Sequence, residues 1–268
     1  MTNSLGGEEI HPMIYGMYLS AQGADVQARR LDVIANNLAN ASTTGFKRDL
    51  ALIQSHPPFS KINGKNADPD AVKNATGGTT LAGIATDYRD ASLTDTGNSL
   101  DLAIRGPGFF RVSDGEQQYL TRAGNFAMNA KGEVVTQSHG LSLMNSSGTP
   151  ISIPSNISKI VVGEDGGVTG LVQGTLEPIT LGKVGVVQPE SFDRLQKIGE
   201  GLYVDDGSAE QAGNEVSVQQ GFLEASGTRP MQEMLEMIET SRVLEMNVNS
   251  IKLQDESLGR LLQAMPNR

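Results

Sequence analysis

The residue types that most often carry catalysis or bind metals are sparse in this 268-residue chain. Its three histidines, His11, His56 and His139, are far apart in the sequence. None lies in an H-E-x-x-H or H-x-H pattern, which would bring two imidazoles to one metal ion. Cysteine is absent, which excludes a thiolate nucleophile, a disulfide and a Cys-type zinc site. The sequence therefore gives little support to a metal centre.

Paired carboxylates are a second candidate for chemistry, because two acids on either side of a bond can hydrolyse a glycoside. Such pairs occur at Glu8-Glu9 and Asp205-Asp206, but no pattern brings two acids into one cleft, and aromatic residues make up only 4% of the chain. Gly106-Pro107-Gly108 lacks the Lys-Ser/Thr of a phosphate-binding loop and is typical of a tight turn. We predict that the protein is not an enzyme, with no catalytic, cofactor-binding or metal-binding residues.

The charge of the chain narrows the choice of partners. A formal net charge of −10 argues against nucleic acid, whose phosphates are bound by clustered Lys and Arg. No apolar run approaches the ~20 residues that cross a bilayer. The segment 1–10 carries two Glu and no Lys or Arg, unlike a secretory signal peptide. We expect no nucleic acid or small-molecule partner, and a cytoplasmic protein or one exported without a cleaved signal.

The N-terminal region, residues 13–45, has the pattern of a helix. Gly16 and Gly23 weaken it by about 1 kcal/mol each relative to Ala, and Thr44-Gly45 is a stop signal. Small and apolar residues keep a seven-residue repeat, typical of a helix that packs along another helix. The repeat consists of Ile14, Met17, Ala21, Ala24, Ala28, Leu31, Ala35 and Leu38.

The C-terminal region, residues 224–268, predicts a second helix whose first turn starts near Pro230. Its repeat consists of Met234, Met237, Leu244, Val248, Ile251, Leu258 and Leu262, with Ser241 and Asp255 as polar exceptions. Neither terminal helix has an obvious core of its own. We therefore predict that the two helices pair as one coiled-coil unit.

The middle of the chain follows other patterns. Residues 46–80 are rich in Pro, Asn, Gly and Lys, and indicate an extended linker or loop. Residues 81–223 alternate short β-type runs with turns such as Ser113-Asp114-Gly115, residues 129–132 and Asp165-Gly166. The prediction is an α+β chain, with a central all-β domain inserted between paired N- and C-terminal helices.

Three asparagines, Asn36, Asn37 and Asn40, lie among the apolar residues at the end of the first helix. An ordinary core helix has little use for them, so this stretch indicates a surface that fits another protein. Amides carry no net charge, and they can fix the register of a contact without the desolvation cost of ions.

Three long motifs resemble the flagellar axial proteins, the rod and hook family. They are ANNLANASTTGFKR at residues 35–48, TGNSLDLAIRGPGFFRV at 96–112 with YLTRAGNFAMNAKGEVVTQSHG at 119–140, and GFLEASGTRPMQEMLEMIETSRVLEMN at 221–247. The chain length and single β domain resemble rod proteins. SRVLEM at 241–246 resembles the proximal-rod type, whereas the distal type usually has Gln-Arg-Ala-Tyr-Glu there. Residues 1–12 precede the family's usual start, as an N-terminal extension.

The resemblance implies a structural subunit of the basal-body rod, a helical axial tube that transmits torque in the periplasm. It implies other axial rod and hook proteins, copies of the same chain and the flagellar export apparatus as partners, with type III export and an uncleaved signal. The expected subunit-interface residues are Ile34, Asn36, Asn37, Leu38, Asn40, Thr44, Gly45, Phe46, Met237, Leu244, Val248 and Ile251.

Other functions stay open at this point. The closest alternative is the distal-rod subunit of the same tube. A carbohydrate-active or peptidoglycan-cleaving enzyme would need acids that converge in a pocket. A binding module with coiled-coil ends, such as an adhesin, would form a closed oligomer of fixed size.

Overall fold

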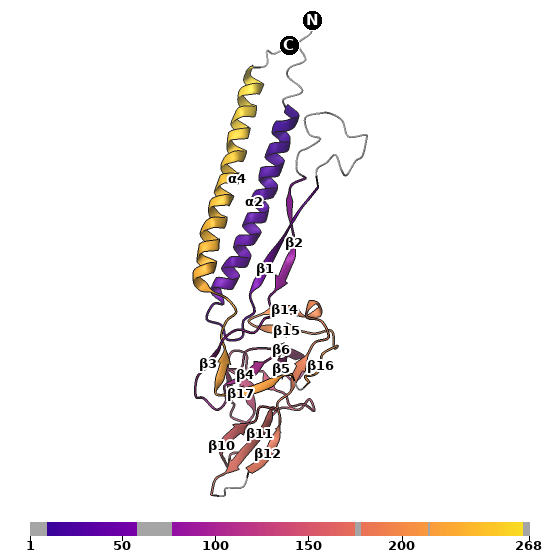
Figure 1. Ribbon diagram of the computed structural model, residues 1–268, viewed down its shortest axis with the longest axis vertical. Coiled ribbons are helices and arrows are strands. Elements are labelled where there is room, and N and C mark those ends of the chain that lie inside the picture. Colours follow the sequence, from indigo (N-terminus) through magenta and orange to yellow (C-terminus); the bar gives the residue numbers. More distant parts are fainter. Residues whose placement is uncertain (1–9, 58–76, 175–177, 214, 265–268) are drawn as a thin grey trace. The chain divides into compact units, whose positions relative to one another are not determined.

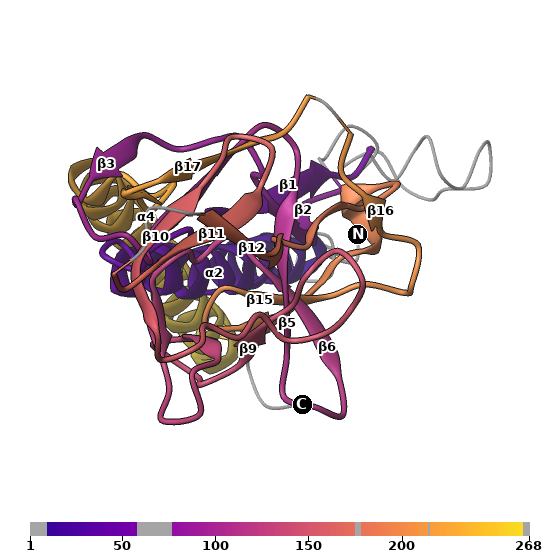
Figure 2. The ribbon, with the colours of Figure 1, turned by 90° about the horizontal axis from the view of Figure 1, so that it is seen from below.

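The computed structural model describes residues 10–57, 77–174, 178–213 and 215–264. These residues form two compact units, which we call the helical unit and the β unit. Figures 1 and 2 show both units in ribbon form. The helical unit takes residues 10–39, 49–57, 77–86 and 230–264 of the described chain. The β unit takes residues 40–48, 87–174, 178–213 and 215–229.

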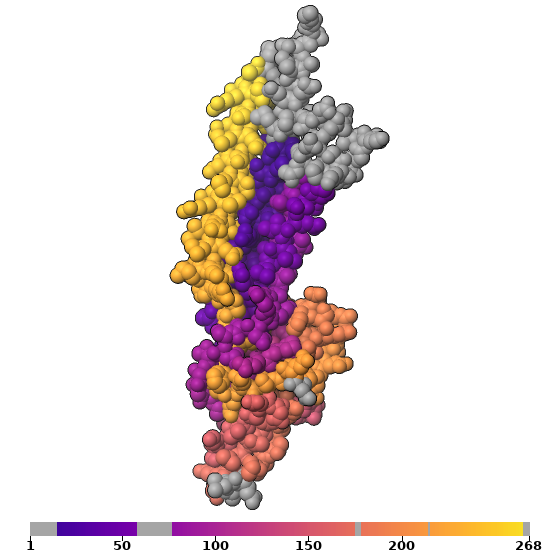
Figure 3. Space-filling view, viewed as in Figure 1, coloured from indigo at the N-terminus to yellow at the C-terminus, as the bar shows by residue number. Residues whose placement is uncertain are grey.

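Two long helices, α2 (Ile10–Ala39) and α4 (Pro230–Ala264), run antiparallel along each other in the helical unit (Figure 1). In the space-filling view, α4 (yellow) lies along α2 (indigo) (Figure 3). A Cβ on Gly16 would lie 3.2 Å from Gln254 Nε2, and one on Gly23 would lie 3.0 Å from Asn247 Nδ2. A step of seven residues along α2 is thus matched by seven residues back along α4, with a glycine facing a polar side chain each time.

The helix contacts differ from the predicted seam by one position. On α4, Glu233 and Thr240 are buried, while Met234, Val248 and Leu262 are 47%, 37% and 65% exposed. The α4 residues that face α2 are thus at positions 233, 240, 247 and 254, and not at the predicted positions 234, 241, 248 and 255. The other predicted line is half-buried, at Met237, Leu244, Ile251 and Leu258. The prediction was wrong for positions 234, 241, 248 and 255 because it assumed that apolar residues face α2. The glycines on α2 leave room for polar side chains of α4 instead.

The same correction applies to α2. Val26, Val33 and Ile34 are its buried apolar residues, whereas Ala21, Ala28 and Ala35 of the predicted repeat are exposed. The helix also ends at Ala39, earlier than the predicted stop at Thr44-Gly45. Asn40 starts a turn instead, since its carbonyl accepts from the Thr43 amide at 3.1 Å and its side chain from the Thr43 hydroxyl at 3.2 Å.

A hairpin completes the helical unit. Strands β1 (Asp49–Ser55) and β2 (Thr79–Thr86) pair antiparallel from Asp49↔Thr86 to Ser55↔Thr79, with a bulge at Leu52/Ile53, and they pack against α2. The composition of residues 46–80 predicted a linker or loop, which was wrong for β1 and for the start of β2. Residues 58–76 of that segment, and 1–9 of the expected N-terminal extension, lie outside the described residues.

The β unit is built from short antiparallel strands. Its main sheet has the order β14-β15-β6-β5-β9-β8-β7, and β13 joins β5 to β16. A separate sheet has the order β10-β11-β12, and two pairs are β17-β4 and β18-β3. The strands are β3 (Leu93–Asp95), β4 (Leu102–Arg105), β5 (Phe109–Ser113), β6 (Gln118–Thr121), β7 (Phe126–Met128), β8 (Val134–Thr136), β9 (Ser142–Leu143), β10 (Ile157–Val162), β11 (Gly167–Val172), β12 (Pro178–Lys183), β13 (Val186–Gln188), β14 (Gln196–Gly199), β15 (Leu202–Val204), β16 (Glu210–Gln211), β17 (Ser217–Gln220) and β18 (Phe222–Glu224).

The three predicted turns are hairpin connections. They join β5 to β6, β7 to β8 and β10 to β11. Gly115, Gly132 and Gly166 take positive φ angles of 101°, 83° and 83° in them. This conformation favours glycine, because a Cβ would collide with the following carbonyl oxygen.

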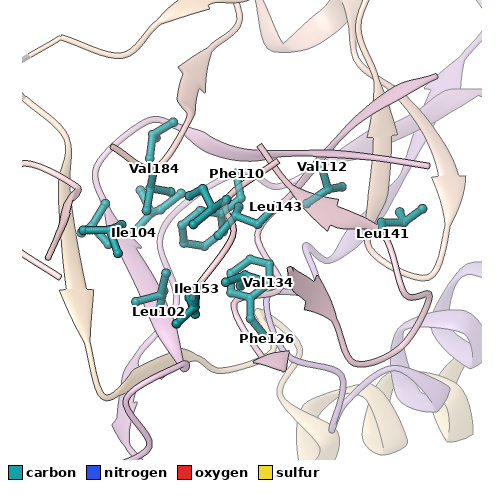
Figure 4. Close-up of a cluster of buried hydrophobic side chains, with 14 of the residues drawn as sticks. Leu102, Ile104, Phe110, Val112, Phe126, Val134, Leu141, Leu143, Ile153 and Val184 are labelled. Atoms are coloured by element: carbon teal, nitrogen blue, oxygen red, sulfur yellow. The ribbon is translucent and has the colours of Figure 1, made fainter. Parts of the chain in front are cut away.

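Two apolar clusters hold the β unit together. The larger surrounds Phe110 and Phe126, whose rings meet edge to face with centroids 5.3 Å apart (Figure 4). The smaller surrounds Phe109 and Tyr203, and Tyr88 packs beside them. The predicted α+β class is confirmed, with two helices and a large multi-stranded β unit in the described residues.

Candidate functional site

The interface residues predicted near the end of α2 fall into two groups by exposure. Ile34 and Asn37 are buried, at 3% and 1% exposed, respectively. Asn36 is exposed, whereas Leu38 and Asn40 are half-buried. Of the three asparagines, Asn36 is therefore the one in the exposed class.

Asn37 uses its side chain within the helical unit. Its Nδ2 donates to the carbonyl oxygen of Asp49 at 2.8 Å, and its Oδ1 accepts from the Asp49 amide at 2.9 Å. The same Nδ2 lies 3.4 Å from Glu233 Oε2. Asn37 thus joins the end of α2 to the first residue of β1 and the first turn of α4. The sequence analysis did not predict this intramolecular role.

The predicted residues Thr44, Gly45 and Phe46 belong to the β unit, where Thr44 is half-buried and the other two are buried. Gly45 has a φ of 66°, and its amide donates to the carbonyl oxygen of Glu224 at 2.9 Å. A Cβ there would lie only 2.4 Å from the carbonyl carbon of Arg122. The Lys197 ammonium lies 4.0 Å from the centre of the Phe46 ring, within range of a cation–π interaction.

Three charged side chains meet directly after this segment. Lys47 Nζ lies 2.7 Å from Glu224 Oε1, and Arg122 Nη1 lies 3.2 Å from Glu224 Oε2, with all three side chains 1% exposed. Burial lowers the pKa of Lys47 below its ordinary value of 10.5, and the attraction of Glu224 partly opposes this shift. One buried carboxylate therefore pairs with two buried cations.

Arg122 also connects the cluster to a turn. Its Nη2 donates to the Gly106 carbonyl oxygen at 2.6 Å, and its Nη1 lies 3.3 Å from Asp90 Oδ1. The other Asp90 oxygen accepts from the Gly106 amide at 3.0 Å. The guanidinium also lies 5.2 Å from the centre of the Phe109 ring. The glycine-rich segment 106–108 is thus a turn that a buried arginine binds through its backbone.

Sequence reasoning missed the buried residues Lys47, Arg122, Glu224 and Glu233. Charged residues are rarely buried without a partner, and the sequence alone does not show which partner each of these residues has. The available signal was their position: all four lie inside the three motifs quoted from the sequence. A charged residue within a long motif would have been a reason to expect pairing.

The predicted interface residues on α4 lie at the edge of the helix pair. Met237, Leu244 and Ile251 are half-buried, and Val248 is 37% exposed. Leu244 and Val248 line a shallow surface groove of about 390 Å³. More exposed apolar residues lie nearer the start of α4. They are Met231 at 71%, Met234 at 47%, Leu235 at 56% and Ile238 at 52% exposed.

Of the acids considered for glycoside hydrolysis, Glu8-Glu9 lies outside the described residues, and Asp205 and Asp206 have other partners. Asp205 Oδ2 accepts from the Ala209 and Gly207 amides at 2.6 and 3.1 Å, and Asp206 Oδ1 accepts from the Ser208 amide at 3.1 Å. They stabilise a turn. Across residues 10–57, 77–174, 178–213 and 215–264, no three His, Cys, Asp or Glu residues cluster as metal ligands would. In the same part of the chain, neither helix has a stretch apolar and long enough to span a membrane.

Comparison with known proteins covers all three motif regions. Family models match as "Flagella basal body rod protein" over residues 17–47, "Flagellar hook protein FlgE/F/G D1 domain" over 103–170 and "Flagellar basal body rod FlgEFG protein C-terminal" over 219–264. The flagellar basal-body rod protein FlgG of Buchnera aphidicola subsp. Schizaphis graminum is 33% identical, with 94% of this chain and 100% of that protein covered. The chain belongs to the flagellar basal-body rod protein family.

Other relatives in this family carry two names. FlgG of Bacillus subtilis is 32% identical over 93% of this chain and 98% of its own length. The rod protein FlgF of Caulobacter vibrioides is 32% identical over 87% of this chain and 92% of its own length. The predicted resemblance is confirmed, and membership in the rod family implies assembly with other axial proteins. The buried residues Asn37, Lys47, Arg122, Glu224 and Glu233 all lie in regions that the family models match.

Proposed function

We propose that this chain is a structural subunit of the flagellar basal-body rod. It assembles with copies of itself and with other axial rod and hook proteins into a helical tube, and it transmits torque through packing without catalysis. The observation that carries this proposal is the similarity to rod proteins along 94% of the chain, including both terminal helices. A tube of this kind needs heterologous contacts that repeat without closing on themselves.

The exposed side of α4 supports contacts with neighbouring subunits. Met231, Leu235 and Ile238 lie four and three residues apart, so they share one face of the helix. Each is more than half exposed. Contiguous apolar patches on a soluble protein often mark interaction sites. We add this face to the predicted interface residues, of which Asn36 and Val248 are also exposed.

The two terminal helices are proposed to form a coiled coil. Support comes from the antiparallel contact of α2 with α4 and from its seven-residue spacing, at Gly16 with Gln254 and at Gly23 with Asn247. Glycine on one side allows the helix axes to approach closely. The predicted division of the chain, with two terminal helices around a central β domain, is proposed with the helices at α2 (Ile10–Ala39) and α4 (Pro230–Ala264) and with the hairpin β1–β2 added to the helical part.

A proximal position in the rod is supported by the sequence SRVLEM at residues 241–246. The distal-rod type usually has Gln-Arg-Ala-Tyr-Glu there, and this chain lacks that Gln and Tyr. The distal-rod subunit is the alternative. Both FlgG and FlgF relatives agree with a rod protein, and their printed names give no position along the rod.

The proposed location is the periplasmic rod of the flagellar basal body. Family membership supports export by the flagellar type III apparatus with an uncleaved signal, because the axial family is assembled from subunits that pass through that channel. Nucleic acid is not among the proposed partners, in keeping with the net charge of −10.

A wall-degrading enzyme is the candidate of a different class, and the described residues do not favour it. Glu164 and Asp165 line a surface recess of about 270 Å³ in the β unit, but no aromatic side chain lines it for stacking on a sugar. Asp165 Oδ1 accepts from the Gly167 amide at 3.1 Å and so belongs to the β10–β11 turn. Purified protein is expected to release no fragments from peptidoglycan.

Deletion of the gene tests the rod function and the position in the rod together. We expect a deletion strain to lose motility and filaments, with assembly arrested before the distal rod, and the intact gene to restore both. Arrest at the hook stage would replace the proximal assignment by the distal one. Normal flagella in the deletion strain would refute the rod function.

A further inference from the structure

The chain passes between the helical unit and the β unit four times. Each passage is a single peptide bond between residues assigned to different units. The four bonds are Ala39–Asn40, Arg48–Asp49, Thr86–Asp87 and Arg229–Pro230. Any force carried along the backbone from one unit to the other runs through these bonds.

On the β-unit side, the first and last passages are joined by a hydrogen bond. Ser226 Oγ, three residues before the last passage, donates to the Asn40 carbonyl oxygen at 2.9 Å. Glu224 precedes Ser226 by two residues and pairs with Lys47 at 2.7 Å. Lys47 lies directly before Arg48, where the second passage begins. Three of the four passages are thus connected by buried or half-buried polar groups.

The remaining passage joins the same cluster. The Asp87 amide donates to the Arg48 carbonyl oxygen at 2.8 Å. Lys47 Nζ donates to the Arg89 carbonyl oxygen at 2.9 Å, and the Ala91 amide donates to Glu224 Oε1 at 3.0 Å. We call Lys47, Arg122 and Glu224, with Ser226 and Asp90, the β-unit clamp.

On the helical-unit side, the same four passages meet at a second cluster. Asn37, near the end of α2, makes two hydrogen bonds with the backbone of Asp49, the first residue of β1. Thr86, the last residue of β2, donates its hydroxyl to Asp49 Oδ1 at 2.8 Å. Glu233 in the first turn of α4 is fully buried and lies 3.4 Å from Asn37. We call these four residues the helical-unit clamp.

We propose that the two clamps are a force-transmitting device, which holds all four backbone passages at both ends. This inference rests on the proposed function as a torque-transmitting rod subunit. Each clamp lies within its own unit and gathers one end of every passage. Within each unit, load carried along the backbone therefore reaches the ends of all four passages through one connected cluster.

The chemistry of the β-unit clamp suits this role. Buried ion pairs give little net stability, but removal of one partner leaves an uncompensated charge and is strongly destabilising. Glu224 pairs with both Lys47 and Arg122, and all three side chains are 1% exposed; Asp90 supplies a second negative charge 3.3 Å from Arg122. Loss of any one of these charges would therefore disrupt the whole cluster, which favours a single fixed arrangement of the three side chains.

Amide hydrogen exchange on the purified full-length chain tests the clamp, with Glu224→Gln as the variant. Glu190→Gln is the matched control, because Glu190 pairs with Arg194 at the surface, where the two side chains are 71% and 52% exposed. We expect exchange in residues 40–48 and 87–91 to rise at least about tenfold in Glu224→Gln, while β5 and β6 exchange as in the wild type. Unchanged exchange in 40–48 and 87–91, or an equal rise throughout the β unit, would overturn the clamp.

A second variant, Thr86→Val, tests the helical-unit clamp without a charge change. It removes the hydroxyl that bonds Asp49 and keeps the size of the side chain. In a deletion strain that carries either clamp variant, we expect isolated basal bodies with a complete rod, and swimming speed that falls more steeply with viscosity than in the wild type. Complete rods with a normal response to viscosity would refute the clamps but leave the rod function intact. Loss of the rod function itself would appear in the deletion strain.

Discussion

Replacement of Gly45 by Ala tests the close packing that holds the segment after α2 in the β unit. Gly45 has a φ of 66°, where a non-glycine residue costs about 1–2 kcal/mol. Gly97 has the same φ of 66°, but a Cβ there would meet no atom within 4 Å. The pair Gly45→Ala and Gly97→Ala therefore separates the cost of backbone conformation from the cost of contact.

The contact at Gly45 is with backbone atoms that have little room to move. A Cβ would lie 2.4 Å from the carbonyl carbon of Arg122, 2.5 Å from its oxygen and 2.7 Å from the Ala123 nitrogen. Overpacking of a well-packed site costs typically 1–3 kcal/mol. We expect Gly97→Ala to lower the free energy of unfolding by about 1–2 kcal/mol, and Gly45→Ala to lower it by that amount and about 1–3 kcal/mol more.

Urea unfolding of the full-length protein provides the assay. The chain has five tyrosines and no tryptophan, and Tyr88 and Tyr203 pack beside Phe109 in the β unit, so tyrosine fluorescence and near-ultraviolet circular dichroism report its unfolding. The difference between the two variants is the quantity to compare, because errors of extrapolation largely cancel. Equal losses of stability within about 0.5 kcal/mol would show that the backbone of Arg122 does not restrict position 45.

Three further perturbations have defined outcomes. The first is Lys47→Met. Between the lowered pKa of Lys47 and 10.5, the unfolded wild type binds more protons than the folded form, so the free energy of unfolding of the wild type should increase relative to that of the variant as pH rises through this window. Urea titrations at a series of pH values would measure this difference. Phe110→Ala should cost about 3–5 kcal/mol in thermal or urea unfolding, whereas Met128→Ala, at a 54% exposed position, should cost under about 0.5 kcal/mol. Gly23→Ala should raise helix content by circular dichroism, since the gain in helix propensity is about 1 kcal/mol and the nearest atom, Nδ2 of Asn247, ends a flexible side chain. A fall in helix content would show that Asn247 does not move aside for the added methyl group.

The sequence predicted the class of the fold because the pattern of the terminal segments differs clearly from that of the central segment. A seven-residue repeat marked both terminal helices, and glycine turns such as residues 129–132 marked the hairpins of the β unit. The prediction of which helix faces meet was wrong. At the contact, glycines of α2 face Asn247 and Gln254, whereas the prediction assumed that apolar residues face each other. The hydrophobic repeat alone therefore predicted a contact face that is displaced by one residue on each helix.

The interface residues were harder to predict for a related reason. Asn36 and Asn37 are adjacent and chemically identical, yet Asn36 is exposed and Asn37 is buried, with 1% of its surface exposed. What separates them is hydrogen bonding to the backbone of Asp49, which depends on a hairpin that the sequence analysis read as linker. The buried ion pair of Lys47 was likewise not predicted, since its partner Glu224 lies 177 residues away in the chain.

The repeat between α2 and α4 has a further consequence, because a pattern that recurs every seven residues matches itself again after one helix slides by one repeat. After such a slide, Gly16 would meet Asn247 and Gly23 would meet Thr240, which again places a small residue opposite a polar one. The two helices alone therefore distinguish poorly between neighbouring alignments.

The contact between Asn37 and Glu233 resolves this ambiguity. Asn37 is fastened to Asp49, whose place is fixed by its pairing with Thr86, and only the observed alignment brings Glu233 beside it. A slide by one repeat would leave Asn37 opposite position 226, before α4 begins at Pro230. The buried contact between Asn37 and Glu233 thus selects one of several nearly equivalent alignments, so a chain that lacked this pair would keep its helices but lose their single alignment.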